Sequence, residues 1–176
     1  MPDRSCRGRF EAAMLPHLDA AHNLARWLLG NTEDAEDAVQ DSYLRALTYF
    51  ESFHGDDGRA WLLAIVRHTC YAWMRKNRQH EPIPDAAREL AFTADTSPDP
   101  EALHLKQADR LQVRQSIEAL PAEFREVLVL REMEGLSYKQ IARITDLPIG
   151  TVMSRLARAR RRLHELLGVP AKKETV

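Results

Sequence analysis

The sequence predicts an all-α protein of two small helical domains joined by a flexible linker, with a helix-turn-helix in the C-terminal domain. Apolar residues recur at helical spacing in almost every segment, and no segment shows the alternation of a strand. The stretch 81–102 breaks this pattern, because it holds four prolines, is acidic and has little periodicity. The expected organisation is an N-terminal tail (1–9), a helical unit (10–80), the linker (81–104), a second unit (105–168) and a C-terminal tail (169–176).

Charge is sorted along the chain rather than mixed. The 176 residues carry a formal net charge of −1, and 44% of them are hydrophobic, which is ordinary for a globular protein. Residues 31–41 contain acids and no base, residues 59–80 contain bases and no acid, and residues 137–162 are again basic. Because local fields govern partner binding more than the net charge does, a nucleic-acid partner is compatible with this composition.

Several classes of protein are not expected. The N-terminus lacks an apolar core of signal-peptide length, and no apolar run approaches the roughly 18 residues of a membrane span. We therefore expect a cytoplasmic protein with no membrane contact of its own. Cys6 and Cys70 form no disulfide framework, and Cys70 is expected in the core. The sequence has no metal-ligand spacing, nucleophile–base pair or phosphate-binding glycine loop, so we expect no metal, no cofactor and no enzyme activity.

The segment 151–163, TVMSRLARARRRL, combines a core-facing stripe with many arginines. At 100° per residue its apolar side chains gather on one side of a helix, which is predicted to be buried. That side comprises Val152, Leu156, Ala159 and Leu163, with Leu166 and Leu167 further on. The opposite side comprises Thr151, Ser154, Arg158, Arg161 and Arg162. This exposed face is suited to an anionic partner.

The residues before this segment predict how the arginine-rich helix is held. A first helix should bury Phe124, Val127, Leu128 and Met133 and end at a Gly135 cap. A short second helix should begin with a capping box of Ser137 and Gln140 and stop at a turn containing Pro148 and Gly150. Helix, tight turn and basic helix together predict a helix-turn-helix whose last helix enters the DNA major groove. The alternative is a solvated basic helix in a coiled pair.

The acidic segment 31–47 also divides into two faces. Asp37, Gln40, Asp41 and Leu44 lie away from the apolar side. Acidic residues at a helix start complement the helix dipole, which explains Glu33 and Asp34 but not the deeper acids. On spacing alone, a docking surface for a basic protein and a solvated face remain equally open.

The basic segment 59–78 is predicted to form a longer helix. Its buried side comprises Leu62, Ile65, Val66, Thr69, Cys70 and Trp73, and its other side comprises Arg67, His68, Tyr71, Arg75 and Arg78. Cations interleaved with aromatic rings can follow a phosphate backbone while stacking on unpaired bases. Trp61 lies at the edge of this face, and a core position is the alternative for Trp61 and Trp73.

Three quoted segments resemble one family, the bacterial RNA polymerase sigma factors of the extracytoplasmic-function type. DAEDAVQDSYLRAL looks like the polymerase-binding part of the second conserved sigma region. FHGDDGRAWLLAIVRHTCYAWMRKNR looks like its promoter-melting and minus-ten-reading part. LPAEFREVLVLREMEGLSYKQIARITDLPIGTVMSRLARARRRL resembles the fourth region, which reads the minus-thirty-five element. The resemblance covers about 10–80 and 112–167, in the order of the family.

The resemblance implies roles for individual positions. The polymerase-binding set is Asp37, Gln40, Asp41 and Leu44. The minus-ten DNA set is His54, Arg59, Trp61, Arg67, His68, Tyr71 and Arg75. The minus-thirty-five DNA set is Thr151, Ser154, Arg155, Arg158, Arg161 and Arg162. Met153 departs from the family, since relatives often have a basic residue there.

The implied mechanism is binding without chemistry on a substrate. The factor docks on core RNA polymerase, engages two promoter elements and offsets duplex opening by capturing extruded bases. An anti-sigma protein is implied as a further partner. One alternative is a stand-alone helix-turn-helix regulator, which needs a dimer interface that the sequence does not offer. A nucleic-acid-processing enzyme needs a catalytic set that is missing.

The acidic face can be tested by charge reversal. Asp37→Arg with Asp41→Arg should leave the helix folded, because neither position is on the buried side, but should weaken binding to core polymerase. A pull-down with core enzyme, alongside circular dichroism, measures both. Unchanged affinity with preserved helicity would return this face to the solvated-surface interpretation.

Overall fold

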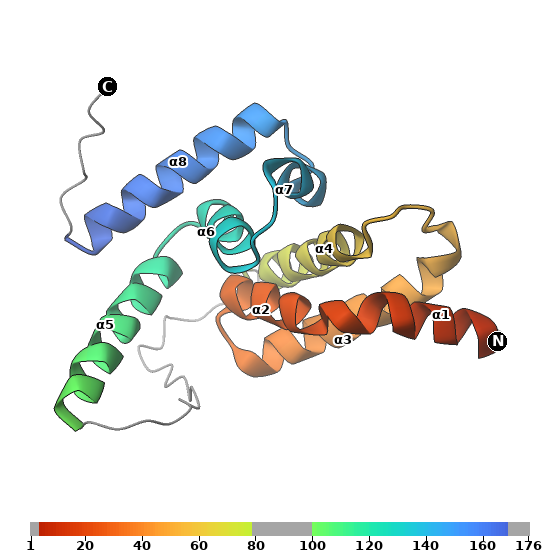
Figure 1. Ribbon diagram of the computed structural model, residues 1–176, viewed down its shortest axis with the longest axis horizontal. Coiled ribbons are helices and arrows are strands. Elements are labelled where there is room, and N and C mark those ends of the chain that lie inside the picture. The colour runs from red at the N-terminus through yellow and green to blue at the C-terminus, as the bar shows by residue number, and fades with distance from the viewer. Residues whose placement is uncertain (1–3, 79–99, 169–176) are drawn as a thin grey trace.

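The structure, a computed structural model, describes residues 4–78 and 100–168 and is helical throughout its regular elements (Figure 1). The N-terminal unit contains α1 (Arg4–Met14), η1 (Leu15–His17), α2 (Leu18–Leu29), α3 (Thr32–Tyr49), η2 (Phe50–Ser52) and α4 (Gly58–Arg78). The C-terminal unit contains α5 (Pro100–Glu118), α6 (Ala122–Leu128), η3 (Val129–Met133), α7 (Tyr138–Thr145) and α8 (Ile149–Leu166). The prediction of an all-α fold is confirmed.

The core of the N-terminal unit lies where α2, α3 and α4 pack against one another. It consists of Leu24, Leu28, Ala35, Ala38, Val39, Leu62, Leu63, Val66 and Cys70, each no more than 3% exposed. The turn between α2 and α3 places Gly30 at φ 70°, a left-handed conformation that glycine adopts without a Cβ clash. The Asn31 side chain then accepts a hydrogen bond of 2.9 Å from the Glu33 N–H and caps α3.

Aromatic side chains fix the segment that leads into α4. The Phe10 ring packs edge-on against Phe50 at 5.3 Å, and Phe53 packs on Trp61 with ring centroids 4.9 Å apart. The Tyr43 hydroxyl donates a 2.8 Å hydrogen bond to the Met14 carbonyl. These contacts join α1 and α3 to the start of α4, which begins the face expected to meet DNA.

In the C-terminal unit, α6 and α7 both pack against α8. Val127, Leu130, Ile141, Val152 and Leu156 are at most 1% exposed there. Gly135 has φ 64°, the left-handed conformation of a glycine at a helix end, and the Leu136 N–H donates to the Leu130 carbonyl, six residues back, at 3.1 Å. The predicted glycine cap is therefore present.

Two residues predicted on buried faces are exposed instead. Met133 and Leu166 are both 42% exposed. The segment Val129–Met133 is a π-helix, so the 100° step used for the prediction no longer holds when the chain reaches Met133. Leu166 lies in the last turn of α8, beyond the short helices that cover its earlier turns (Figure 1).

The two units pack against each other, which their sequence did not predict. Helix α7 contacts α4, and α6 contacts α2. Figure 1 shows α6 and α7 lying against the side of the N-terminal unit formed by α2 and α4, whereas α5 extends away from both. A flexible linker by itself would leave the spacing of the two units unfixed in the free protein, but here the buried side chains of both units form one continuous cluster.

Helix α5 begins inside the stretch expected to be a linker. The linker prediction covered 81–104, whereas α5 starts at Pro100. Proline suits the first turn of a helix, because its missing N–H has no intrahelical partner to lose there. Residues 81–99 of the predicted linker, and the two predicted tails except for 4–9, lie outside the described residues.

Arg125 of α6 connects the ends of two other helices. One guanidinium nitrogen donates to the Trp27 carbonyl at 2.8 Å, and the other donates to the Glu118 and Leu120 carbonyls at 2.9 and 2.8 Å. Burial lowers the pKa of Arg125. Because the last carbonyls of a helix have no partner within it, this side chain satisfies the ends of α2 and α5 together and ties the two units.

Arg125→Met should destabilise the fold, because it keeps an unbranched side chain in place of the aliphatic part of Arg125 but removes the donors to the helix-end carbonyls. We expect a loss of about 1–3 kcal/mol in the free energy of unfolding, measured by urea denaturation. Arg161→Met, at an exposed position of α8, is the control and should change stability by no more than about 0.5 kcal/mol. Equal effects of the two variants would contradict the role of Arg125.

Candidate nucleic-acid and polymerase interfaces

The acidic face of α3 lies on the surface of the N-terminal unit. Asp37 and Gln40 are exposed, and Leu44 is 60% exposed, whereas Asp41 is half-buried and pairs with Arg45 at 3.1 Å. The opposite side of α3 supplies Ala35, Ala38, Val39, Ser42 and Ala46 to the core. The four predicted polymerase-binding residues thus share an accessible surface with an apolar side chain at its end.

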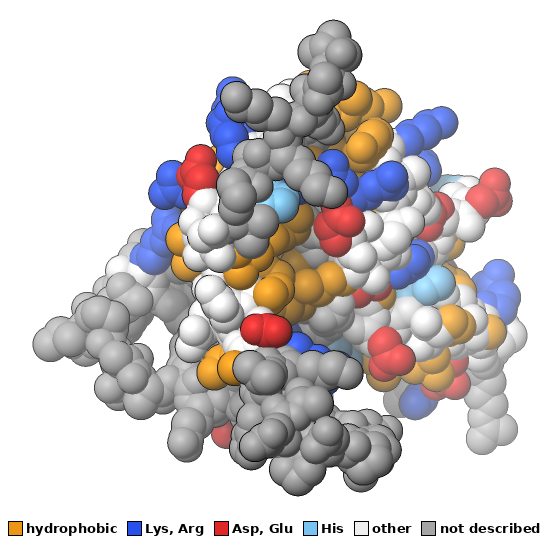
Figure 2. Space-filling model, turned by 60° about the vertical axis from the view of Figure 1, so that its left-hand side comes forward, with side chains coloured by type: hydrophobic (Ala, Val, Ile, Leu, Met, Phe, Trp, Pro, Cys, Tyr) orange, Lys and Arg blue, Asp and Glu red, His pale blue; other side chains and the backbone are white. Residues whose placement is uncertain are grey.

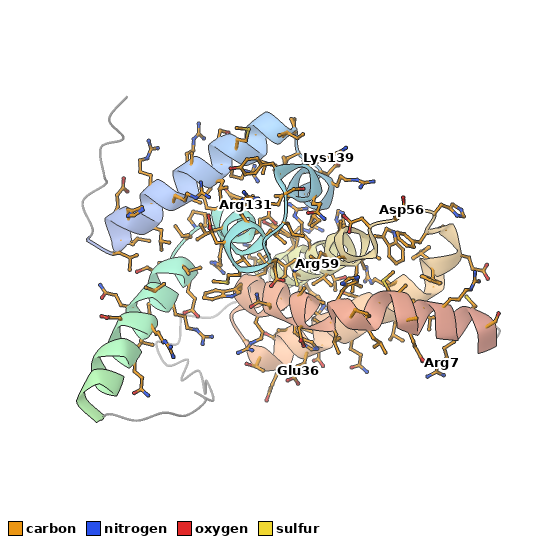
Figure 3. All side chains as sticks on the ribbon, in the orientation of Figure 1. Arg7, Glu36, Asp56, Arg59, Arg131 and Lys139 are labelled. Carbon is orange, nitrogen blue, oxygen red and sulfur yellow. The ribbon has the colours of Figure 1, made fainter. Side chains whose placement is uncertain are left out.

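The basic side of α4 faces the C-terminal unit. Arg59 donates a 2.6 Å hydrogen bond to Glu134, and Glu134 also accepts from the Asn23 amide. Figure 3 shows Arg59 in the middle of the molecule, where the two units meet, while Arg7 and Glu36 extend from the outer side. The first predicted minus-ten residue of this helix is therefore engaged by a carboxylate.

Arg67 also pairs with a glutamate of the C-terminal unit, but through two hydrogen bonds. Its Nε and Nη2 donate to the two carboxylate oxygens of Glu126 at 2.7 and 3.2 Å. The Glu126 side chain has no exposed surface, and that of Arg67 is 16% exposed. Burial alone would lower the pKa of Arg67, but the hydrogen bonds and charge of Glu126 outweigh burial and raise it. Arg67 consequently remains charged within the interface.

Glu126 faces basic residues from two helices. Besides Arg67 of α4, it has Arg155 of α8 at 3.9 Å. One is a predicted minus-ten residue and the other a predicted minus-thirty-five residue. A single buried carboxylate therefore lies between the two surfaces expected to bind DNA.

Tyr71 is covered in the same interface. The Arg67 guanidinium lies 4.5 Å from the centre of the Tyr71 ring, which is within the range of a cation–π contact. Burial raises the pKa of Tyr71, and the negative charge of Glu126 adds to the rise. In this arrangement the ring is not open to an unpaired base.

The other predicted minus-ten residues differ in their environment. His54, His68 and Arg75 are exposed, whereas Trp61 is half-buried against Phe53. The contact of Trp61 with Phe53 agrees with the alternative prediction for this residue, a position in the core. Of the seven predicted residues, Arg59, Arg67 and Tyr71 thus lie against the C-terminal unit, whereas His54, His68 and Arg75 are exposed.

A third polar contact joins the starts of α4 and α7. One Asp57 carboxylate oxygen accepts from the Ala60 N–H, and the other accepts from Gln140 at 2.9 Å. Burial alone would raise the pKa of Asp57, but these hydrogen bonds hold it below its usual value. Because Gln140 also belongs to the capping box of α7, one side chain links the N-terminal ends of two helices.

The helix-turn-helix has the caps that the sequence predicts. Ser137 accepts from the Gln140 N–H at 3.2 Å, and Gln140 accepts from the Ser137 N–H at 2.9 Å. The turn differs in detail, because its left-handed residue is Asp146 at φ 54°, and Gly150 lies in the first turn of α8. A short polar side chain tolerates this conformation better than most.

Helix α8 presents most of the predicted minus-thirty-five residues along its outer side, whereas Arg155 lies towards the buried Glu126. Ser154, Arg158, Arg161 and Arg162 are exposed, while Thr151 and Arg155 are half-buried. Val152, Leu156 and Ala159 anchor the inner side at no more than 1% exposure. Figure 2 shows positive and negative side chains interspersed on the face that it presents.

The sequence interpretation missed the acidic partners of the basic residues. Glu126 and Glu134 were not singled out, nor was Arg125. A partial signal was present for Glu126, since a charged residue that directly precedes the apolar run 127–130 must find a partner once it is buried. No comparable signal marks Glu134, whose partners lie in the other unit.

Other kinds of site receive no support from the described residues. No group of three His, Cys, Asp or Glu side chains among them could hold a metal ion. Cys70 is fully buried in the core, as predicted, and this burial raises the pKa of its thiol to about 12. In the same part of the chain, every helix is too short or too polar to cross a membrane.

The comparisons with known proteins match both units in order. Residues 14–80 match the family model for sigma-70 region 2, and residues 110–163 match that for sigma-70 region 4. The ECF RNA polymerase sigma-E factor of Salmonella typhimurium is 36% identical over 134 residues, covering 72% of this chain and 70% of that protein.

Solved structures give the same result for the fold. The sigma factor RpoE of Bartonella quintana, crystallised with the anti-sigma factor NepR, matches with a TM-score of 0.74 and 32% identity over 92% of this chain and 98% of that one. CnrH, solved with the cytosolic domain of CnrY, matches with a TM-score of 0.65 and 25% identity, covering 92% and 89%.

A helical pair of sigma-70 regions 2 and 4 defines a transcription initiation factor of the sigma-70 class. Within that class, this chain belongs to the extracytoplasmic-function (ECF) sigma factors.

Glu126→Gln should loosen the packing of the two units, because it removes the charge that holds Arg67 while keeping the shape of the side chain. Spin labels at Glu36→Cys and Arg161→Cys, both exposed positions, would report the distance between units, since Cys6 and Cys70 are buried. We expect a longer and broader distance distribution. Glu132→Gln, which affects a contact with Arg160 inside the C-terminal unit, is the control. An unchanged distribution would contradict the role of Glu126.

Proposed function

We propose that this chain acts as an ECF sigma factor that binds core RNA polymerase, recognises two promoter elements and assists strand opening. The observation that carries the proposal is the order of the two matched regions, 14–80 and 110–163, in one chain. Each region also has a surface suited to its proposed partner. The acidic face of α3 suits polymerase, and the basic faces of α4 and α8 suit DNA. The proposed activity is binding and not catalysis. The binding to core polymerase would take place in the cytoplasm.

The first step is docking through α3. Asp37, Gln40 and Asp41 offer charge and hydrogen bonds to a basic polymerase surface, and Leu44 offers apolar contact beside them. Most interface energy comes from a few central contacts, with polar groups around them. The exposed leucine next to acidic residues fits that arrangement better than a face built only for solubility.

The second step exposes the strand-opening face. We call the packing of the two units against each other the closed arrangement. In it Arg67 donates hydrogen bonds to Glu126, so DNA can reach Arg67 and Tyr71 only after the units separate. A hydrogen bond between charged groups is worth about 1.5–3 kcal/mol, so separation needs a comparable gain elsewhere. Docking of both units on core polymerase would supply it, and promoter phosphates would then replace the carboxylates of Glu126 and Glu134.

The third step is recognition of duplex DNA by α8. The first turns of the second helix in a helix-turn-helix reach base edges in the major groove. Ser154 and Arg158 lie on the outer side of these turns, and Arg161 and Arg162 follow as contacts to phosphate. Core polymerase would hold the DNA-binding surfaces of α4 and α8 at a set distance, so that binding of one promoter element favours binding of the other. The expected gain in affinity is on the order of 10²–10⁴.

An anti-sigma protein is the further partner we propose. RpoE, a structural relative, was solved in complex with the anti-sigma factor NepR, and CnrH was solved with the cytosolic domain of CnrY. A regulator that contacted both units of this chain would favour the closed arrangement, in which Arg59, Arg67 and Tyr71 are covered. The stand-alone regulator has no comparable support, because both matched regions belong to a polymerase subunit.

Two substitutions should affect different steps of initiation. With core enzyme present, Arg158→Ala should lower promoter occupancy roughly tenfold, because it removes a major-groove contact. Tyr71→Ala should mainly impair strand opening, because it removes a stacking platform for unpaired bases. Gel shift measures occupancy and permanganate footprinting measures opening.

Arg7→Ala is the matched control for that pair of substitutions, since Arg7 is an exposed arginine on α1, far from α8 (Figure 3). It should change neither occupancy nor opening. Tight, specific duplex binding by the isolated protein, with no effect of polymerase, would favour a stand-alone regulator and overturn the proposal.

A further inference from the structure

Two large apolar side chains stand exposed at the beginning of α8. Ile149 is 46% exposed and Met153 is 51% exposed. They are four residues apart, so they lie on the same flank of the helix, one turn from each other. The core of the C-terminal unit does not need them, because Val152 and Leu156 fill the inner side of these turns at no more than 1% exposure.

This apolar flank lies in the part of α8 that a helix-turn-helix inserts into the major groove. Exposed Ser154 follows Met153 directly, and exposed Gly150 lies between the two apolar residues. Gly150 has open space around it, because no atom outside its own stretch of helix lies within 4 Å of the position that a Cβ would take there. A base edge can therefore approach the helix closely between Ile149 and Met153.

The charges of α8 separate this flank from the phosphate-binding side. Arg160 lies two turns after Met153 on the same flank, but its guanidinium is held by Glu132 at 2.9 Å. Arg158 and Arg162 lie towards the other flank and are exposed. The helix thus offers cations on one side, which suit phosphates, and an apolar pair on the other. The neighbouring cations favour nucleic acid over an apolar protein surface as the occupant.

The chemistry of Met153 restricts what it can recognise. A thioether donates no hydrogen bond and accepts only weakly, so it cannot read the N7 and O6 acceptors of guanine as a basic residue would. It is unbranched, polarizable and adapts to an irregular apolar surface. The apolar feature of the major groove is the 5-methyl group of thymine.

We propose that Met153, supported by Ile149, selects thymine at one position of the upstream promoter element by contact with the 5-methyl group. This specificity rests on the proposed function, because it places α8 in the major groove of a promoter.

The test uses the full-length protein reconstituted with core polymerase. A promoter is first selected by this holoenzyme from duplexes with a randomised upstream element. Each thymine of the selected element is then replaced by deoxyuridine, which keeps every hydrogen-bonding group and lacks only the methyl. At one position we expect the replacement to weaken binding roughly three- to tenfold, the size expected for one apolar contact.

Variants assign that methyl contact to a residue. Met153→Ala should bind the thymine and deoxyuridine promoters equally, with an affinity close to that of the wild-type protein on deoxyuridine. Met153→Arg should shift the preference at the same position from thymine to guanine. Leu15→Ala, an exposed apolar residue of the N-terminal unit with 52% exposure, is the control and should retain the wild-type discrimination.

The failures of the two proposals are distinguishable. Equal binding of thymine and deoxyuridine promoters by the wild-type holoenzyme, or a selected element without thymine, would overturn the methyl contact while leaving the sigma function in place. A loss of core binding by Met153→Ala would mean that the flank meets polymerase instead of DNA. A holoenzyme that selects no promoter would overturn the proposed function itself.

Discussion

A buried carboxylate, that of Glu126, needs a positive partner, and much of the structure depends on where that partner comes from. Isolating a charge from water costs several kcal/mol unless it is paired and hydrogen-bonded. Glu126 belongs to the core of the C-terminal unit, yet its bidentate partner Arg67 belongs to α4 of the N-terminal unit. The core of one unit is therefore completed electrostatically by the other, and the side of α4 that we propose to face DNA is turned inward as a result.

The same principle explains the choice of residues along the interface. Glu134 accepts from Arg59 and Asn23, Asp57 accepts from Gln140, and Arg125 donates to the ends of α2 and α5. Each contact is polar, and most use a group that already has a local task, such as a helix cap or a carbonyl at a helix end. Polar contacts of this kind can be exchanged for water or for phosphates, although the buried apolar side chains of both units also form one continuous cluster. Separation of the units, as we propose it, would therefore have to offset the loss of both kinds of contact.

Local features of the chain were predictable because their causes are local. The capping box of Ser137 and Gln140, the Gly135 cap and the buried stripe of α8 follow from spacing within a few residues. The outer residues Asp37, Leu44, Ser154 and Arg158 are exposed as their helical positions predict. The failures at Met133 and Leu166 come from a π-helical turn and from the lack of a covering helix, which a 100° projection does not contain.

Contacts between the units could not be predicted in the same way. Arg67 and Tyr71 are on the outer face of α4, as predicted, but that face is covered by residues some 59 positions further along the chain. The periodicity of the sequence indicates which side of a helix is polar. It does not indicate which distant element packs against that side. The buried Glu126 was the one available indication, because an acid that directly precedes an apolar run requires a partner once it is buried, without identifying it.

Because the two units belong to one chain, the contact between Arg67 and Glu126 has a consequence for dosage. Closure is unimolecular, so dilution or overproduction of the protein leaves the ratio of closed to open molecules unchanged. What closure changes is the apparent dissociation constant for any partner that binds only the open form, which equals the intrinsic constant divided by the open fraction. Each 1.4 kcal/mol in favour of closure raises the concentration of such a partner needed for half-occupancy about tenfold. The strength of one ion pair can therefore set how this chain competes for a limited supply of polymerase.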